Sequence, residues 1–84
     1  MKREIKQEWC ENFILAIFKK MPDGYGIEVG YFWKMAENSG LWERGTYGTP
    51  MSAALGKLVD PKTKTDQNGE FLYDVFYLKE GAKA

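Results

Sequence analysis

The stretch that decides the fold is Thr49-Pro50-Met51-Ser52-Ala53-Ala54-Leu55-Gly56-Lys57-Leu58-Val59. Thr49 is suited to cap a helix, because its hydroxyl can accept a hydrogen bond from a free backbone N–H of the first turn. Pro50 then takes the first helical position, where the missing N–H is tolerated and the fixed φ already suits the helix. Apolar residues follow at positions 51, 54, 55 and 58, the spacing of one helical face. The sequence therefore predicts a helix over 49–59.

The opposite face of this helix carries small side chains, Ser52, Ala53 and Gly56, with Lys57 beside them. A glycine in a helix interior lowers stability by about 1 kcal/mol relative to alanine, a loss that close packing can offset. Either an external partner or another element of the same chain would pack there, and the sequence leaves both open.

Two helices are expected upstream. The first covers residues 3–20, where two parallel apolar rows form a face broad enough for a globular core. One row is Ile5, Trp9, Phe13 and Ile17, and the other is Cys10, Ile14, Phe18 and Met21. The second helix covers residues 29–38 and follows a brief edge strand at 25–28. Gly40 suits the left-handed residue that closes a helix, with Leu41 making the accompanying apolar contact.

We expect a core built from the aromatic side chains of these two helices. Its members are Trp9, Phe13, Phe32 and Trp33. Cys10, the only cysteine, is expected to be a small buried hydrophobe, since the chain has no histidine that could activate it as a nucleophile.

A β-hairpin is expected downstream. Asp60-Pro61 ends the third helix, because the residue before a proline is driven out of the helical region. Strands are predicted over 62–65 and 71–79, joined by a turn at Asn68-Gly69, a dipeptide typical of hairpins.

The last strand of this hairpin has apolar residues on both faces. Leu72, Phe76 and Leu78 form the expected core face. The other face carries Phe71, Tyr73, Val75 and Tyr77. Because amphipathic tyrosine tolerates partial exposure, this second face is a candidate surface for a partner or a second copy. The alternative is that the N-terminal arm or the first helix covers it.

Size and composition describe a single domain over residues 1–84, with a core from about 5 to 79 and a frayed tail at 80–84. Hydrophobic residues make up 44% and charged residues 29%, the proportions of an ordinary folded domain rather than a disordered one. The 12 basic residues balance the 12 acidic ones, so the global charge points to no polyanionic partner. The local balance is +3 from residue 44 to 65, but only +1 from 43 to 66.

Several functional classes are not indicated. The chain has no histidine, and no nucleophile–base constellation, metal-ligand cluster or phosphate-binding glycine loop is evident. We therefore expect a protein that is not an enzyme and needs no metal or cofactor. No apolar run approaches the ~20 residues that span a bilayer, and no leader is evident, so we expect a cytoplasmic protein with no membrane partner.

The order of the expected elements, helix, short strand, helix, helix, strand, turn and strand, resembles the winged-helix superfamily from about Ile5 to Lys79. The stretch Thr49-x-x-x-Ala53-x-Leu55-x-x-Leu58 is similar to a pattern common in the third helix of that family. The resemblance implies an α+β fold of three helices with a small antiparallel β-hairpin wing. It also implies that 49–59 is a recognition helix for the DNA major groove and that 62–79 is the wing.

The resemblance implies a small DNA-binding regulatory domain, whose binding surface these two segments form. The residues expected to bind nucleic acid are Arg44, Tyr47, Thr49, Ser52, Lys57, Lys62 and Lys64. The basic side chains would contact phosphates, the two hydroxyls the backbone or a base edge, and Tyr47 a base. Neutral overall charge and a helix face poor in base-reading side chains predict weak, salt-sensitive binding to duplex DNA, aided by dimerisation through the Tyr73 and Tyr77 face.

The alternative is a protein–protein interaction module on the same scaffold, a small regulatory or phage-type protein without DNA binding. It would use the small-residue face of the third helix and the aromatic side chains of the connector 42–48. Of these, Trp42 is better suited to the core, and Tyr47 is open to either role. A continuous positive strip from the third helix to residues 62–65 would favour nucleic acid, and a mixed strip beside exposed aromatics would favour protein.

Overall fold

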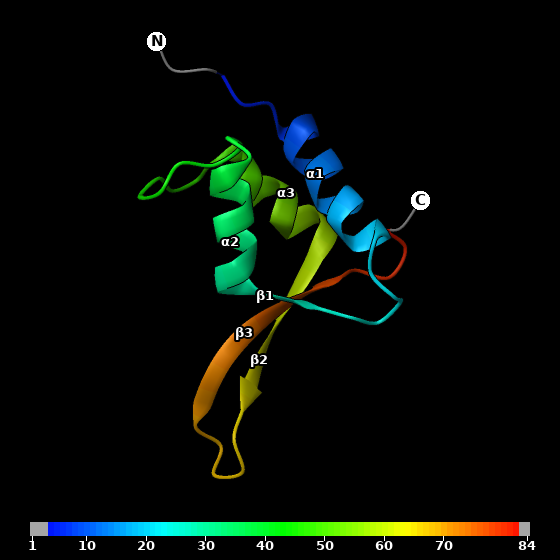
Figure 1. Ribbon diagram of the computed structural model, residues 1–84, viewed down its shortest axis with the longest axis vertical. Helices are drawn as coiled ribbons and strands as arrows, with labels where there is room; N and C mark the ends of the chain where they lie inside the picture. The colour runs from blue at the N-terminus through cyan, green and yellow to red at the C-terminus, as the bar shows by residue number, and fades with distance from the viewer. Residues whose placement is uncertain (1–3, 83–84) are drawn as a thin grey trace.

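Residues 4–82 are described by the computed structural model, in which three helices gather at one end of a three-stranded antiparallel sheet (Figure 1). The elements in chain order are α1 (Gln7–Lys19), β1 (Ile27–Glu28), α2 (Val29–Asn38), α3 (Pro50–Leu58), β2 (Val59–Thr65) and β3 (Phe71–Leu78). The strand order is β1-β3-β2, so the brief β1 lies at an edge, as expected. The predicted α+β class, with three helices and an antiparallel hairpin, is confirmed.

Helix α3 has the predicted cap and the predicted inward face. The Thr49 hydroxyl accepts a hydrogen bond from the backbone N–H of Ser52 at 3.3 Å, and Pro50 opens the helix. The apolar residues at 51, 54, 55 and 58 are buried. The small residues and Lys57 on the opposite face are exposed.

Helix α3 runs into β2 with no intervening residue, which the sequence did not predict. Val59 is buried and extended instead of helical, and β2 therefore begins three residues before the expected Lys62. Pro61 is tolerated within β2 because the strand lies at the edge of the sheet. A proline has no backbone N–H, and at an edge its absence need not cost a hydrogen bond to the neighbouring strand. The backbone N–H of Lys79 donates to the Leu58 carbonyl at 2.8 Å and extends the pairing up to the helix end.

Helix α1 is shorter than predicted and buries one of its two apolar rows. It begins at Gln7, and the residue where we expected it to begin, Arg3, lies outside the described residues. Cys10, Ile14 and Phe18 are buried, whereas Trp9 is 38% exposed, so its expected core position is wrong. The reason is geometric, because the row containing Trp9 runs along the margin of the contact between α1 and the rest of the molecule, where the side chains are only partly covered.

Helix α2 supplies the centre of the core and ends as predicted. The Phe32 ring, fully buried, makes edge-on contacts with Phe13, Trp33 and Phe76 at centroid distances of 6.0, 5.6 and 5.5 Å. Gly40 has a φ of +78°, and its N–H donates to the Glu37 carbonyl at 3.1 Å. This pattern is a Schellman motif, since the N–H of Leu41 also reaches back to the carbonyl of Ala36.

The faces of β3 follow the predicted alternation only in the half that lies near the helices. Phe76 is buried and Leu78 packs against the core, but Leu72 is 53% exposed, so its expected core position is wrong. The cause is that the hairpin projects beyond the helices and gives the molecule a length of 48 Å and a thickness of 18 Å (Figure 1). On the other face Val75 is buried beneath Gly26, while Phe71 and Tyr73 remain 64% and 44% exposed.

The hairpin turn and the chain end complete the fold. A three-residue loop, 67–69, is closed by a hydrogen bond from the Asp66 N–H to the Glu70 carbonyl at 2.9 Å, with Gly69 at a φ of +80°. Of the tail expected to be frayed, residues 80–82 instead form a turn in which Ala82 packs against the core, and residues 83–84 lie outside the described part.

Candidate functional site

The outward face of α3, formed by Ser52, Ala53 and Gly56, is open to solvent. A Cβ atom added at Gly56 would meet no atom within 4 Å, so no other described part of the chain packs there. The sequence left open whether another element of the same chain or an external partner packs on this face. Within residues 4–82, the structure excludes the first of these two. We call these three residues the small-residue face.

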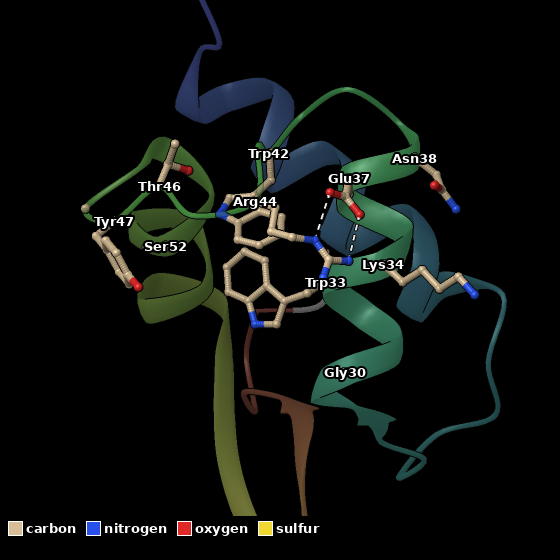
Figure 2. Close-up of a pocket in the computed structure, with 11 residues that line it drawn as sticks. Gly30, Trp33, Lys34, Glu37, Asn38, Trp42, Arg44, Thr46, Tyr47 and Ser52 are labelled. Carbon is tan, nitrogen blue, oxygen red and sulfur yellow. Dashed lines mark hydrogen bonds and ion pairs between the residues drawn. The ribbon is translucent and has the colours of Figure 1, made fainter.

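A groove lies between α2, the connector and the start of α3, with a volume of about 700 Å³ (Figure 2). Its lining residues are Gly30, Trp33, Lys34, Glu37, Asn38, Trp42, Arg44, Thr46, Tyr47, Gly48 and Ser52. The indole rings of Trp33 and Trp42 lie 4.6 Å apart between centroids, tilted by 46°, and both pack against the core. Trp42 is therefore both a core residue, as the sequence favoured, and part of the groove wall.

An ion pair crosses the groove between Arg44 and Glu37. The Nε and Nη2 atoms of Arg44 donate to the two carboxylate oxygens of Glu37 at 3.3 and 3.2 Å (Figure 2). The hydrogen bonds from Arg44 lower the pKa of Glu37, and the same bonds raise the pKa of Arg44. Arg44 therefore has a carboxylate partner at hydrogen-bond distance, while 78% of its side chain stays exposed to solvent.

Lys57 is paired with a carboxylate on α1. Its Nζ atom donates to Oε1 of Glu11 at 3.0 Å, joining residues that are 46 positions apart in the sequence. The hydrogen bond from Lys57 is the main reason why the pKa of Glu11 is lowered. At the adjacent helix end, the Lys79 ammonium donates to the Gly56 carbonyl at 2.9 Å.

Lys62 and Lys64 lie on the hairpin, beside tyrosine rings. The register pairs Lys62 with Val75 and Lys64 with Tyr73, which places the lysines on the sheet face that points away from Phe76. Their Nζ atoms lie 5.8 and 5.4 Å from the Tyr77 ring centroid, within the range of cation–π contacts. A hydrogen bond with Tyr77 raises the pKa of Lys64.

The structure gathers the expected nucleic-acid residues into two groups instead of one strip. Arg44, Tyr47 and Ser52 line the groove, with Thr49 hydrogen-bonded to Ser52 at its edge. Lys62 and Lys64 lie on the outer sheet face, and Lys57 belongs to neither group, because its ammonium is paired with Glu11 on α1. Carboxylates are interspersed with these cations, so the charge along α3 and the hairpin is mixed.

The sequence reasoning missed the contribution of α2 to the groove. Gly30, Lys34, Glu37 and Asn38 line it from that helix. A signal was present, because these residues recur at intervals of four, three and one and so form a polar stripe along one helical face. The sequence does not show that the connector lies opposite this stripe, and so the groove between them could not be predicted.

Within 4–82 no group of three or more acidic or cysteine side chains is arranged to hold a metal ion. Cys10 is buried, and desolvation together with the neighbouring Glu11 charge raises its thiol pKa. Among the helices of the described chain, none has the length and apolar character required to cross a bilayer.

Comparison with known proteins returned no matching family model, no similar curated protein and no similar solved structure.

Proposed function

We propose that this protein binds nucleic acid through α3, the connector and the β2–β3 hairpin, as a small winged-helix-like regulatory domain. The order α1-β1-α2-α3-β2-β3 supports this proposal, because it resembles the order of elements in that superfamily. Fold alone does not decide function, so the proposal depends on the exposed surface.

The observation that carries the proposal is the small-residue face, open to solvent on a capped helix whose end leads directly into a projecting hairpin. Small side chains allow a helix backbone to approach a groove or a phosphate chain closely. The hydroxyls of Thr49 and Ser52 offer donors to phosphate oxygens. A protein surface with so few bulky side chains would bind a partner protein weakly through this face.

The mixed charge along α3 and the hairpin counts against this proposal, since a continuous positive strip was expected for nucleic acid, and it predicts weak affinity for duplex DNA. Arg44 and Lys57 each have a carboxylate partner, so each would have to leave or share that partner to contact a phosphate. Lys62 and Lys64 have no ion pair within residues 4–82 and are the readiest phosphate contacts. With two to four phosphate contacts, the logarithm of the binding constant should fall with the logarithm of salt concentration with a slope of about −2 to −4.

The test is fluorescence anisotropy of labelled duplex DNA at low salt. We expect binding by the wild type and its loss in the variant Ala53→Glu/Gly56→Glu, because two carboxylates on the small-residue face repel phosphates while both positions remain solvent-exposed in a helix. Asn12→Glu on the exposed side of α1 is the matched control and should bind as the wild type does. Absence of binding by the wild type at about 100 μM, the weak end of non-specific affinities, would refute the proposal.

Protein–protein interaction is a second candidate, favoured by a specific observation. Phe71, Leu72 and Tyr73 form a run of three exposed apolar side chains at the distal end of β3, and Tyr47 is 93% exposed on the connector. Together with the mixed charge along α3 and the hairpin, these exposed aromatics are typical of a protein-binding surface. The same surface could join two copies of the chain through the face that carries Tyr73.

A further inference from the structure

The groove between α2 and the connector has features of a ligand site, and its aromatic floor, formed by Trp33 and Trp42, has no part in the duplex binding proposed above. Its volume of about 700 Å³ lies within the range of roughly 300–1,000 Å³ that is common for small-molecule sites. Its floor is aromatic and its rim is polar, the usual arrangement where one part of a ligand is stacked and another is hydrogen-bonded.

The floor is suited to a flat aromatic ring. Trp33 and Trp42 are half-buried, so each indole is fixed by the core and leaves part of its surface in the groove. Figure 2 shows the Trp33 ring in the middle of the groove, between Tyr47 and Lys34. Nucleobases of any sequence stack on such rings, because every base has a π-face.

The rim is suited to an anion. Lys34 and Arg44 are opposed by Glu37 alone among the charged lining residues, which leaves one positive charge in excess. Lys34 has no ion pair within the described part of the chain. Arg44 has five N–H donors and uses two of them on Glu37, so three are available to a phosphate while the carboxylate holds the guanidinium in position.

We propose that this groove holds one unpaired nucleotide of a single-stranded nucleic acid, with its base on Trp33 and Trp42 and its phosphate at Lys34 and Arg44. The inference rests on the proposed nucleic-acid function and deepens it. Continuity with the helix surface favours a strand over a free nucleotide, because Ser52 belongs both to the groove and to the small-residue face. Tyr47, exposed at the groove mouth, offers a second ring to the adjoining base.

An aromatic side chain of a protein would fit the groove less completely. It would fill the floor, but it would leave Lys34 and the remaining donors of Arg44 without an anionic partner. The positive charge of Lys34 and Arg44 at the rim therefore favours a nucleotide over an aromatic side chain of a protein.

The test uses the fluorescence of the groove tryptophans. In a Trp9→Phe background the two remaining tryptophans, Trp33 and Trp42, both line the groove. We expect single-stranded hexathymidylate to quench their emission at low salt, with an affinity that falls about tenfold in Lys34→Gln and in Arg44→Gln. Lys19→Gln, on the exposed side of α1, is the matched control and should leave the titration unchanged.

Three outcomes would overturn the inference. The first is no quenching by hexathymidylate up to about 10 mM, and duplex binding measured separately would then still decide the proposed function. The second is thymidine monophosphate binding as tightly as the hexamer, which would assign the groove to free nucleotides. The third is stronger quenching by N-acetylphenylalanine amide than by the hexamer, which would assign it to a protein side chain.

Discussion

Gly26 and Gly56 have opposite environments, since the space beside the first is filled and the space beside the second is open. A Cβ added to Gly26 would lie against Cγ1 of the buried Val75 and 2.8 Å from the Tyr77 ring. A Cβ added to Gly56 would meet open space. Gly26 therefore lets the segment before β1 lie close to β3, whereas Gly56 only makes α3 narrower.

We expect Gly26→Ala to lower the free energy of unfolding by about 1–3 kcal/mol, the usual effect of overpacking. Gly56→Ala should instead raise it by up to about 1 kcal/mol, because alanine is the better helix former and nothing obstructs its methyl group. Urea denaturation of both variants measures this difference. A Gly26→Ala protein as stable as the wild type would show that the contact seen at β3 is not tight in solution.

The elements are joined by polar contacts as well as by the core, and the pair of Glu11 with Lys57 between α1 and α3 is the clearest of these. Because the pKa of Glu11 is lower in the folded state, the pair contributes stability above the ordinary carboxyl pKa. That contribution is lost as the pH falls through the lowered value.

We expect Glu11→Gln to be less stable than the wild type at about pH 6.5, with a smaller deficit at an acidic pH below the lowered pKa of Glu11, because the wild-type carboxylate then loses the charge that pairs with Lys57. Urea midpoints at the two pH values provide the measurement. Glu80→Gln is the control, at an exposed site with no ion pair within residues 4–82. Its difference in stability from the wild type should not shrink in this way at the lower pH. A deficit in Glu11→Gln that persists undiminished at the lower pH would contradict this account.

Local signals explain why some elements were predictable and others were not. The cap at Thr49, the Schellman glycine at Gly40 and the hairpin at Asn68-Gly69 act within a few residues, and each was read correctly from the sequence. The errors at Trp9 and Leu72 concern burial, which depends on how far neighbouring elements extend. Periodicity shows which residues share a face, but not where the covering element ends.

The candidate site was partly predictable for the same reason. The sequence points to Arg44 as a basic residue near the third helix, to Tyr47 as an aromatic residue near its start, and to Ser52 as a hydroxyl on its outward face. The structure places all three at the groove. The partners that neutralise Arg44 and Lys57 lie 7 and 46 residues away, and such pairings are set by tertiary packing. The sequence windows show that acidic residues lie among the basic ones, but they do not show which carboxylate lies beside which cation on the surface.

At the scale of the whole molecule, the projecting hairpin exposes an apolar end that would be covered in an assembly. We expect sedimentation equilibrium to show a mass that rises with protein concentration, because Phe71 and Tyr73 share the outer face of β3 and can pair with a second copy. Phe71→Ser/Tyr73→Ser should restore the monomer. Tyr31→Ser, at an α2 residue that is 60% exposed, is the control and should not.

A wild-type protein that stays monomeric at every concentration would contradict the expected homodimer. It would leave DNA binding to a single domain, with correspondingly few phosphate contacts.

Helix α3 ends at Leu58 and β2 begins at Val59, so a movement of the helix would act directly on the hairpin. Because no loop lies between α3 and β2, we expect a tilt of the helix to be passed on to the strand about a pivot at Leu58 and Val59. At about 3.3 Å per residue, the seven residues of β2 place the hairpin tip roughly 20 Å from the pivot. A tilt of α3 by about 5° on meeting a ligand would therefore swing the tip by about 2 Å, so a reporter group at the tip would register events at the helix.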